Sequence, residues 1–230
     1  MASEGTWDRV LERLLAAAEA TGMIDWSVSV DSTIARAHQH ATNATRLTGA
    51  GSNYTNPRLE PLDHAIGRSR GGLSTKIHHL VDGAAQPLVI LLPPSPGQAG
   101  DSPMFLPLMA QLRVRSPTGR PRTRPDRVRG DKAYSSRAIR SHLRDRGIQA
   151  VIAEPGDQKG HRKRRGSRGG RPPAFDPADY RSRNVIERGF CSLKQWRGLA
   201  TRYDKLALTY RAAAVLHATI TWSVYLSDTP

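Results

Sequence analysis

Four polar residues near the C-terminal end of the chain have types and a spacing that could do chemistry together. They are Tyr180, Arg183, Glu187 and Lys194. On one α-helix, at about 100° per residue, their side chains would fall within about 60° of one another. An apolar stripe beside them would hold this face on a core; it consists of Ile186, Phe190 and Leu193. Any one of the four is explained by a solvated helix face, but together they predict a carboxylate held among cations and a phenol.

Two further carboxylates each follow a predicted strand. Asp31 follows the alternating residues 26–30, and Asp131 follows residues 127–130. Either aspartate alone is more simply a turn former or a helix cap. Three acids that converge at one end of a sheet need cations, and their oxygens suit Mg²⁺ or Mn²⁺, two of which can drive in-line displacement at a phosphodiester. We therefore predict Asp31, Asp131 and Glu187 as catalytic residues and metal ligands.

The charge of the chain predicts a polyanionic partner. Its 230 residues suffice for one domain with a substantial core, and the formal net charge is +15. Nucleic acid is the simplest partner because arginine binds phosphates in a bidentate manner, although biased codon usage explains part of the arginine excess. The single cysteine, Cys191, excludes an internal disulfide and suits a reducing cytoplasm. The N-terminus has no secretory signal, and residues 206–226 contain charge, so a packed helix is predicted there rather than a membrane span.

Residues 158–171 form a strongly basic run without any acid. Such a run repels itself, so it is predicted to be mobile when free. A phosphate-binding arm is favoured over a solubilising loop. Its predicted DNA-binding residues are Lys159, Arg162, Lys163, Arg164, Arg165, Arg168 and Arg171.

The elements that must position these residues alternate between strands and helices. Helices are predicted at residues 6–20, 104–112, 135–146 and 180–194, with a short one at 34–40 inside a long polar excursion over 32–70. Strands are predicted at residues 26–30, 74–81, 87–92, 127–130 and 149–153, the second and third joined as a hairpin around Asp82-Gly83. This order predicts an α/β fold, a mixed sheet with helices on both faces.

The Y-x2-R-x3-E-x6-K pattern of Tyr180, Arg183, Glu187 and Lys194 resembles the signature of bacterial insertion-sequence DDE transposases, particularly the group-five and related group-four elements. Four further segments resemble the same family: residues 30–40, 67–77, 130–134 and 194–198. The resemblance implies a ribonuclease H-like core with Asp31 on its first strand, Asp131 on its fourth and Glu187 on a late helix. It implies that Asp31 bridges two metal ions, that Asp131 and Glu187 each help hold one, and that Tyr180, Arg183 and Lys194 position DNA phosphates.

The implied activity is metal-dependent cleavage of double-stranded DNA at the element ends (the terminal inverted repeats), followed by strand transfer into target DNA. The expected active form is a homodimer or higher oligomer. It is expected in the bacterial cytoplasm, associated with the nucleoid and with no membrane. The expected parts are an N-terminal helix (1–25), the catalytic domain (26–200) with its basic insertion at about 156–174, and a C-terminal helix (201–230). Two rival interpretations stay open, a structure-selective nuclease of this fold and a truncated, non-catalytic DNA-binding relic.

Two departures from the family bear on these expectations. In many relatives a helical, end-recognising region precedes the segment that begins here near Gly5, so that region is either encoded in another reading frame, as an upstream product, or lost. The segment 97–101 is also less polar than in the family. Elsewhere, His38 and His40 lack zinc-site spacing. Only one of His78 and His79 is expected to face the core, and Trp196 is expected to be buried.

Overall fold

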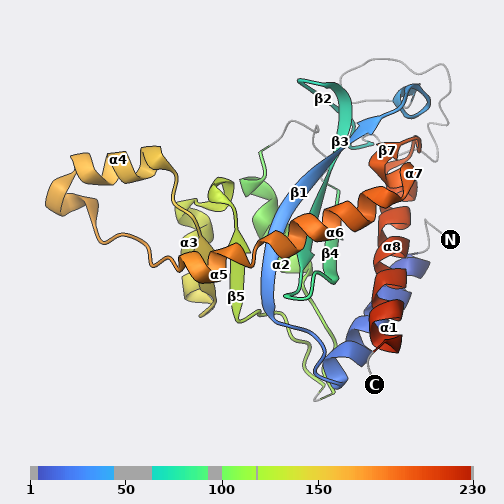
Figure 1. The fold of residues 1–230 in the computed structure, drawn as a ribbon, viewed down its shortest axis with the longest axis horizontal. Coiled ribbons are helices and arrows are strands. Elements are labelled where there is room, and N and C mark those ends of the chain that lie inside the picture. The colour runs from blue at the N-terminus through green and yellow to red at the C-terminus, as the bar shows by residue number, and fades with distance from the viewer. Residues whose placement is uncertain (1–4, 44–63, 93–99, 118, 229–230) are drawn as a thin grey trace.

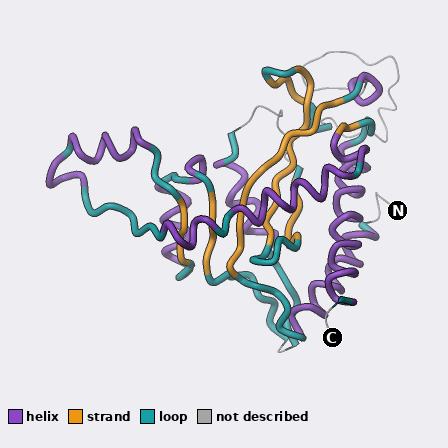
Figure 2. Tube along the Cα trace, viewed as in Figure 1, coloured by secondary structure: helices purple, strands orange, loops and turns teal. Residues whose placement is uncertain are grey.

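The computed structural model describes residues 5–43, 64–92, 100–117 and 119–228, and in these a seven-stranded mixed sheet forms the centre of the molecule (Figures 1 and 2). Its main order is β2-β3-β1-β5-β6, with β4 beside β3 and β7 beside β1. The strands are β1 (Ser27–Ala37), β2 (Gly67–Ser69), β3 (Gly72–Val81), β4 (Pro87–Leu91), β5 (Arg127–Gly130), β6 (Gln149–Ile152) and β7 (Thr201–Arg202). Most of the predicted polar excursion and the prolines after residue 92 lie outside the described residues.

Strand direction divides this sheet into two halves. β1 and β4 run antiparallel to β3, whereas β5 runs parallel to β1 and β6 parallel to β5. The antiparallel half is built by the hairpin predicted around Asp82, and α3 makes the crossover between the two parallel strands. The fold is the ribonuclease H-like α/β arrangement that the resemblance implied.

Strand β1 is longer than its sequence pattern predicts. It continues through Asp31 to Ala37, so the short helix predicted at 34–40 is wrong, and the 3₁₀ turn η1 (Gln39–Asn43) follows instead. The reason is tertiary: β3 supplies an antiparallel partner for every residue from Ser29 to Arg36. Pairing with a strand so distant in sequence overrides the weak local pattern.

The helices lie on the two faces and one edge of this sheet (Figure 1). α6 (Asn184–Gln195) crosses β1 and β3 on one face, while α1 (Thr6–Ala20) and α8 (Ala207–Ser227) pack together beside β4. The remaining described helices are η2 (Ser102–Met104), α2 (Phe105–Gln111), η3 (Lys132–Tyr134), α3 (Arg137–Asp145), α4 (Gly156–Arg164), η4 (Gly166–Gly169), α5 (Pro177–Arg181) and α7 (Arg197–Ala200). No helix in the described ranges is both long and apolar enough to span a bilayer.

The helix predicted at 180–194 is divided in two. α5 ends at Arg181 and α6 begins at Asn184, because backbone hydrogen bonds of the tighter, three-residue type replace the α-helical ones here, as from the Arg183 N–H to the Tyr180 carbonyl. Tyr180 and Glu187 therefore belong to different helices. Trp196, after α6, has 37% of its surface exposed, so the prediction that it is buried is wrong.

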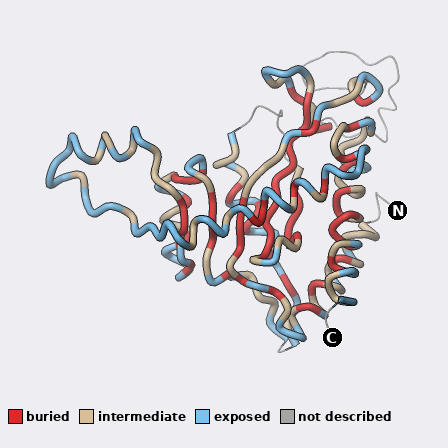
Figure 3. Tube along the Cα trace, viewed as in Figure 1, coloured by how far each residue is buried: buried red, intermediate tan, exposed pale blue. Residues whose placement is uncertain are grey.

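Both faces of β3 are covered, and so both of its neighbouring histidines are buried. His79 lies 5.2 Å from the ring of Phe190 on α6, whereas His78 faces the side from which Asp101 approaches. The expectation that only one would face the core is wrong because helices pack on each face (Figure 3). Burial lowers the pKa of His78 to about 4 and that of His79 to about 3.

These buried histidines predict a loss of stability in acid. Below the ordinary pKa of 6.5, His79 is protonated in the unfolded chain but stays neutral in the folded chain until the pH nears 3. The free energy of unfolding therefore falls as pH falls. Between about pH 6.5 and about pH 4.5 this difference at His79 lowers the free energy of unfolding by about 2 kcal/mol. In denaturant titrations, the free energy of unfolding of His79→Leu should fall less than that of wild type over this pH range, by that amount. His40→Leu, at an exposed position, should keep the wild-type fall; equal behaviour of both variants would contradict the prediction.

Candidate active site

Strand register brings Asp31 and Asp131 together at the edge of the parallel half of the sheet, where β5 ends, although β1 itself continues to Ala37. Val30 pairs with Gly130 across the parallel strands β1 and β5, so the two aspartates follow side by side on backbones about 5 Å apart. Asp131 leaves the strand and caps η3, accepting a hydrogen bond of 2.8 Å from the Ala133 N–H. The juxtaposition predicted for these two acids is present.

Arg183 joins the third acid to this edge. Its Nη1 donates to Asp31 Oδ2 at 2.8 Å, and its Nη2 donates to Glu187 Oε1 at 2.5 Å. The Tyr180 ring lies 5.9 Å from the same guanidinium. Because Arg183 and Glu187 are one helical turn apart on α6, the helix carries both the carboxylate and its cation to Asp31.

The environment of Asp31 disfavours its charged form. Burial raises the pKa of Asp31 most strongly, and the charges of Asp131 and Asp101 raise it further. The Ser32 N–H and Arg183 act in the opposite direction without reversing the net rise. Acids gathered in this way need a cation, and the Arg183 guanidinium supplies one.

Asp101, which precedes η2, contributes a further carboxylate that sequence patterns did not single out. It accepts a hydrogen bond of 2.6 Å from Ser32 Oγ and one of 2.9 Å from Lys76 Nζ. Ser32 alternates with Asp31 along β1, so Asp101 approaches from the opposite face of that strand. It therefore supports Asp31 from behind rather than sharing Arg183 with it.

Tyr134 closes the floor of the site. Its side chain is fully buried, and its hydroxyl has no hydrogen-bond partner among the described residues. Burial raises its pKa, and the charges of Asp101, Asp31 and Asp131 do so too. A side chain at Gly130 would place its Cβ 3.3 Å from both Tyr134 and Val30, so this tight fit favours glycine before Asp131.

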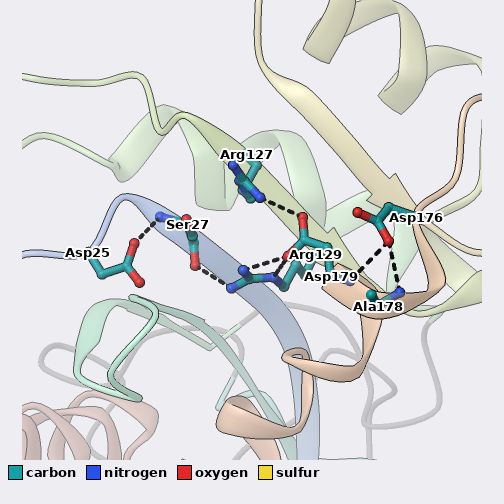
Figure 4. Close-up of polar contacts among 7 residues, drawn as sticks. All are labelled: Asp25, Ser27, Arg127, Arg129, Asp176, Ala178 and Asp179. Atoms are coloured by element: carbon teal, nitrogen blue, oxygen red, sulfur yellow. Dashed lines mark hydrogen bonds and ion pairs between the residues drawn. The ribbon is translucent and has the colours of Figure 1, made fainter.

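A buried clamp holds α5 and its Tyr180 on the sheet (Figure 4). Arg129 of β5 donates from Nε to Asp179 Oδ1 at 2.7 Å and from Nη1 to the Ser27 carbonyl at 2.9 Å, and Arg127 Nη1 donates to Asp179 Oδ2 at 2.8 Å. Burial alone would raise the pKa of Asp179, but the hydrogen bonds from both arginines outweigh it and lower the pKa. The clamp thus links β1, β5 and α5. Neither arginine nor Asp179 was singled out from the sequence.

Removing the clamp should cost stability because it leaves arginines unpaired. The Arg129 and Asp179 side chains are 9% and 7% exposed, so we expect Asp179→Ala to lower the free energy of unfolding by about 3 kcal/mol. The matched control is Asp176→Ala on the same helix, which removes only an N-cap and should cost about 1 kcal/mol. Urea unfolding at neutral pH measures both variants, and equal losses would show that the clamp adds nothing.

The remaining predicted residues lie away from the three acids. Lys194 is exposed on α6, two helical turns or about 10 Å beyond Glu187, and contacts no acid in the described part of the chain. The basic run forms α4 and η4, largely exposed and projecting from the sheet (Figure 3). It is folded there because Gln158 and Arg162 tie it to Ser135 and Glu154. Its contact with DNA stays a prediction.

The carboxylates fit a hard divalent ion by chemistry, but not in their present arrangement. Their oxygens are the ligands such ions prefer. The pKa of Asp31 is raised mainly by burial and further by the charges of Asp131 and Asp101, and an ion would neutralise those like charges. Within the residues described, however, no three His, Cys, Asp or Glu side chains are grouped closely enough to hold a metal. Arg183 lies between Asp31 and Glu187, so ion binding at that pair requires the guanidinium to move.

Comparison with known proteins agrees with this geometry. Residues 25–222, most of the chain, match the family model described as a transposase DDE domain. A putative transposase for insertion sequence element IS402 from Burkholderia cepacia is 32% identical over 141 residues, which cover 61% of this chain and 57% of that protein.

Two solved structures are similar at low identity. They are the Mos1 transposase paired-end complex with left transposon end (13% identity, TM-score 0.34) and the Mos1 strand transfer complex (11%, 0.32). Each match covers 96% of this chain and 60% of the other. The family model spans both aspartates and Glu187, together with the strands and the helix that carry them. The chain belongs to the family of transposase DDE domains.

Proposed function

We propose that this chain is the catalytic part of an insertion-sequence transposase with the Y-R-E-K signature of the group-five and related group-four elements. It cleaves double-stranded DNA at the element ends and joins the freed 3′ ends to target DNA by in-line phosphoryl transfer. The observation that carries the proposal is that Asp31 of β1 and Glu187 of α6 share one arginine, Arg183, while Asp131 follows β5 in register beside Asp31.

Each residue of the site has a role in this reaction. Asp31, Asp131 and Glu187 would hold two Mg²⁺ or Mn²⁺ ions, which would activate the attacking water in cleavage or the 3′-hydroxyl in joining and would stabilise the leaving oxygen. Arg183, Tyr180 and Lys194 orient the phosphates on either side of the cut, Arg183 by a bidentate contact of the kind guanidinium groups make with phosphate. The Arg127–Arg129–Asp179 clamp fixes Tyr180 against β5 so that this orientation is kept.

The same proposal assigns a role to the basic arm and gives the expected assembly and location of the protein. The basic arm, α4 and η4, adds phosphate contacts away from the cut. Two or more copies assemble on the paired element ends, in the cytoplasm and at the nucleoid.

The direct test is a nicking assay with the chain and a duplex that carries the inverted repeats flanking its own gene. Wild type should nick at the repeat boundary when Mg²⁺ or Mn²⁺ is added. The double variant Asp31→Ala with Asp131→Ala should bind the duplex with unchanged or higher affinity, since two negative charges are lost, and should not nick it. Nicking by the double variant at the wild-type rate would refute the assignment of the site. DNA binding without any nicking by the wild type would support a non-catalytic relic instead.

A further inference from the structure

A basic groove lies outside the three acids, lined by residues of α3 and of the arm formed by α4 and η4. Figure 1 shows where these elements lie. The groove encloses about 560 Å³. Arginines line both of its walls: Arg137, Arg140 and Arg144 from α3, and Arg162, Arg165 and Arg171 from the arm. The single acid in the lining, Glu154, is already paired with Arg162. Such an excess of positive charge in a confined space selects an anionic ligand.

The arginines on α3 are already positioned to bind an anion. Arg137, Arg140 and Arg144 recur at helical spacing, so they share a face within about 60°, opposite the buried Ile139 and Leu143. Arg140 is fixed by hydrogen bonds of 2.9 Å to Ser135 Oγ and to the Ile152 carbonyl. In the part of the chain that is described, neither Arg137 nor Arg144 has an ion-pair partner of its own.

The arm is held to α3 at a fixed point. The Gln158 side chain donates to the Ser135 carbonyl at 2.7 Å and accepts from Ser135 Oγ at 3.0 Å. Ser135 directly follows Tyr134, the buried floor of the candidate active site. The groove therefore begins where the active site ends.

An exposed aromatic path joins the groove to the signature residues. Beyond residues 171–173 a second hollow of about 650 Å³ shares Arg140, Arg144 and Arg171 with the groove and includes Phe175. Phe175 is 43% exposed, and its ring lies 5.2 Å from that of Tyr180, which in turn lies beside Arg183. Exposed rings beside a basic channel are the means by which proteins bind unpaired nucleic-acid strands, with bases stacked on the rings and phosphates on the cations.

We propose that this groove binds one unpaired DNA strand as it leaves the active site. The strand passes Tyr180 and Phe175, and its phosphates lie against Arg137 and Arg144. A hollow of this volume has room for a few nucleotides of one strand and not for a turn of duplex. This inference rests on the proposed function for the origin of the strand, and its test uses binding without metal so that cleavage plays no part.

The experiment compares Arg137→Gln/Arg144→Gln with Arg113→Gln/Arg120→Gln, a pair that removes the same charge at exposed positions outside the groove. Probes are a labelled blunt duplex and the same duplex with a single-stranded extension. We expect the groove variant to bind the extended probe about tenfold more weakly than the control variant, with a salt dependence shallower by about 1.4, the sum of two contacts at about 0.7 each. Binding of the blunt duplex should be equal in both.

A second variant tests the aromatic path without changing charge. Phe175→Ala should weaken binding of the extended probe about tenfold, as expected for one lost base stack, and Phe175→Trp should restore it. Equal loss on blunt and extended probes would overturn the assignment to an unpaired strand, and complete displacement of the probe by millimolar inorganic phosphate would reduce the groove to a small-anion site. Identical affinities of the groove and control variants would refute the groove while leaving nicking at Asp31 intact. Conversely, a wild type that shows the groove effect but never nicks would refute the proposed function alone.

Discussion

Replacing Asp31 by asparagine is expected to lower the rate of metal-dependent nicking by about a thousandfold or more. Asp31 contacts Arg183, adjoins Asp131 in register and interacts electrostatically with Asp101. Losing its charge would weaken the hold on the metal ions that stabilise the transferring phosphoryl group. This loss amounts to several kcal/mol, and each 1.36 kcal/mol is about tenfold in rate. Glu187→Gln should have an effect in the same range.

The matched control for Asp31→Asn is Asp101→Asn. Asp101 lies on the other side of β1 and acts through Ser32 and Lys76, so its loss should reduce nicking by about ten- to a hundredfold, as for residues that orient a ligand. Single-turnover nicking with saturating DNA measures all three variants, and circular dichroism checks their folding. If Asp101→Asn proved as damaging as Asp31→Asn, the ranking of the acids would be reversed and Asp101 would belong among the direct ligands.

The sequence was sufficient where a local pattern and the tertiary fold agree. The Asp82-Gly83 turn predicted the β3–β4 hairpin. The acids predicted after two strands, Asp31 and Asp131, lie side by side as expected, although β1 continues beyond Asp31. The spacing of Arg183 and Glu187 likewise predicted a common helix face, which their ion pair confirms. In each case the structure is determined by residues that are close in sequence, or by the regular repeat of side chains along a helix or strand.

Sequence patterns did not predict the structure where it depends on contacts between residues far apart in the sequence. Nothing near Asp101 indicates that it will meet Ser32 and Lys76, because those partners come from strands that precede it. The extension of β1 to Ala37 depends on β3 in the same way, and so does the burial of His78 on a face that α2 covers. The Arg129–Asp179 clamp joins residues 50 positions apart. Such contacts carry no period, so a single sequence does not reveal them.

The second large effect is expected at Arg183, where substitution should strengthen metal binding while weakening catalysis. In the DNA-free chain its guanidinium donates to both Asp31 and Glu187, at 2.8 and 2.5 Å. A divalent ion at this pair must first displace two charge-assisted hydrogen bonds, although Glu187 is 52% exposed and solvent weakens its share. Arg183→Gln should therefore raise the affinity of the DNA-free chain for Mn²⁺ about tenfold, a change of about 1.4 kcal/mol.

DNA should have the same effect on the wild type, because a phosphate competes with the acids for Arg183. Metal and DNA then strengthen each other's binding by one factor, since coupling between two ligands is reciprocal. In Arg183→Gln this coupling should vanish, and nicking should fall because the phosphate loses its bidentate donor. Arg181→Gln, an exposed arginine two residues earlier, is the matched control and should keep both the coupling and the weaker metal affinity. Mn²⁺ titrations followed by electron paramagnetic resonance, with a non-cleavable duplex present or absent, measure all of these quantities. Equal Mn²⁺ affinities for the two DNA-free variants would show that the guanidinium does not compete with the metal, and Arg183 would then be a permanent structural partner of Asp31.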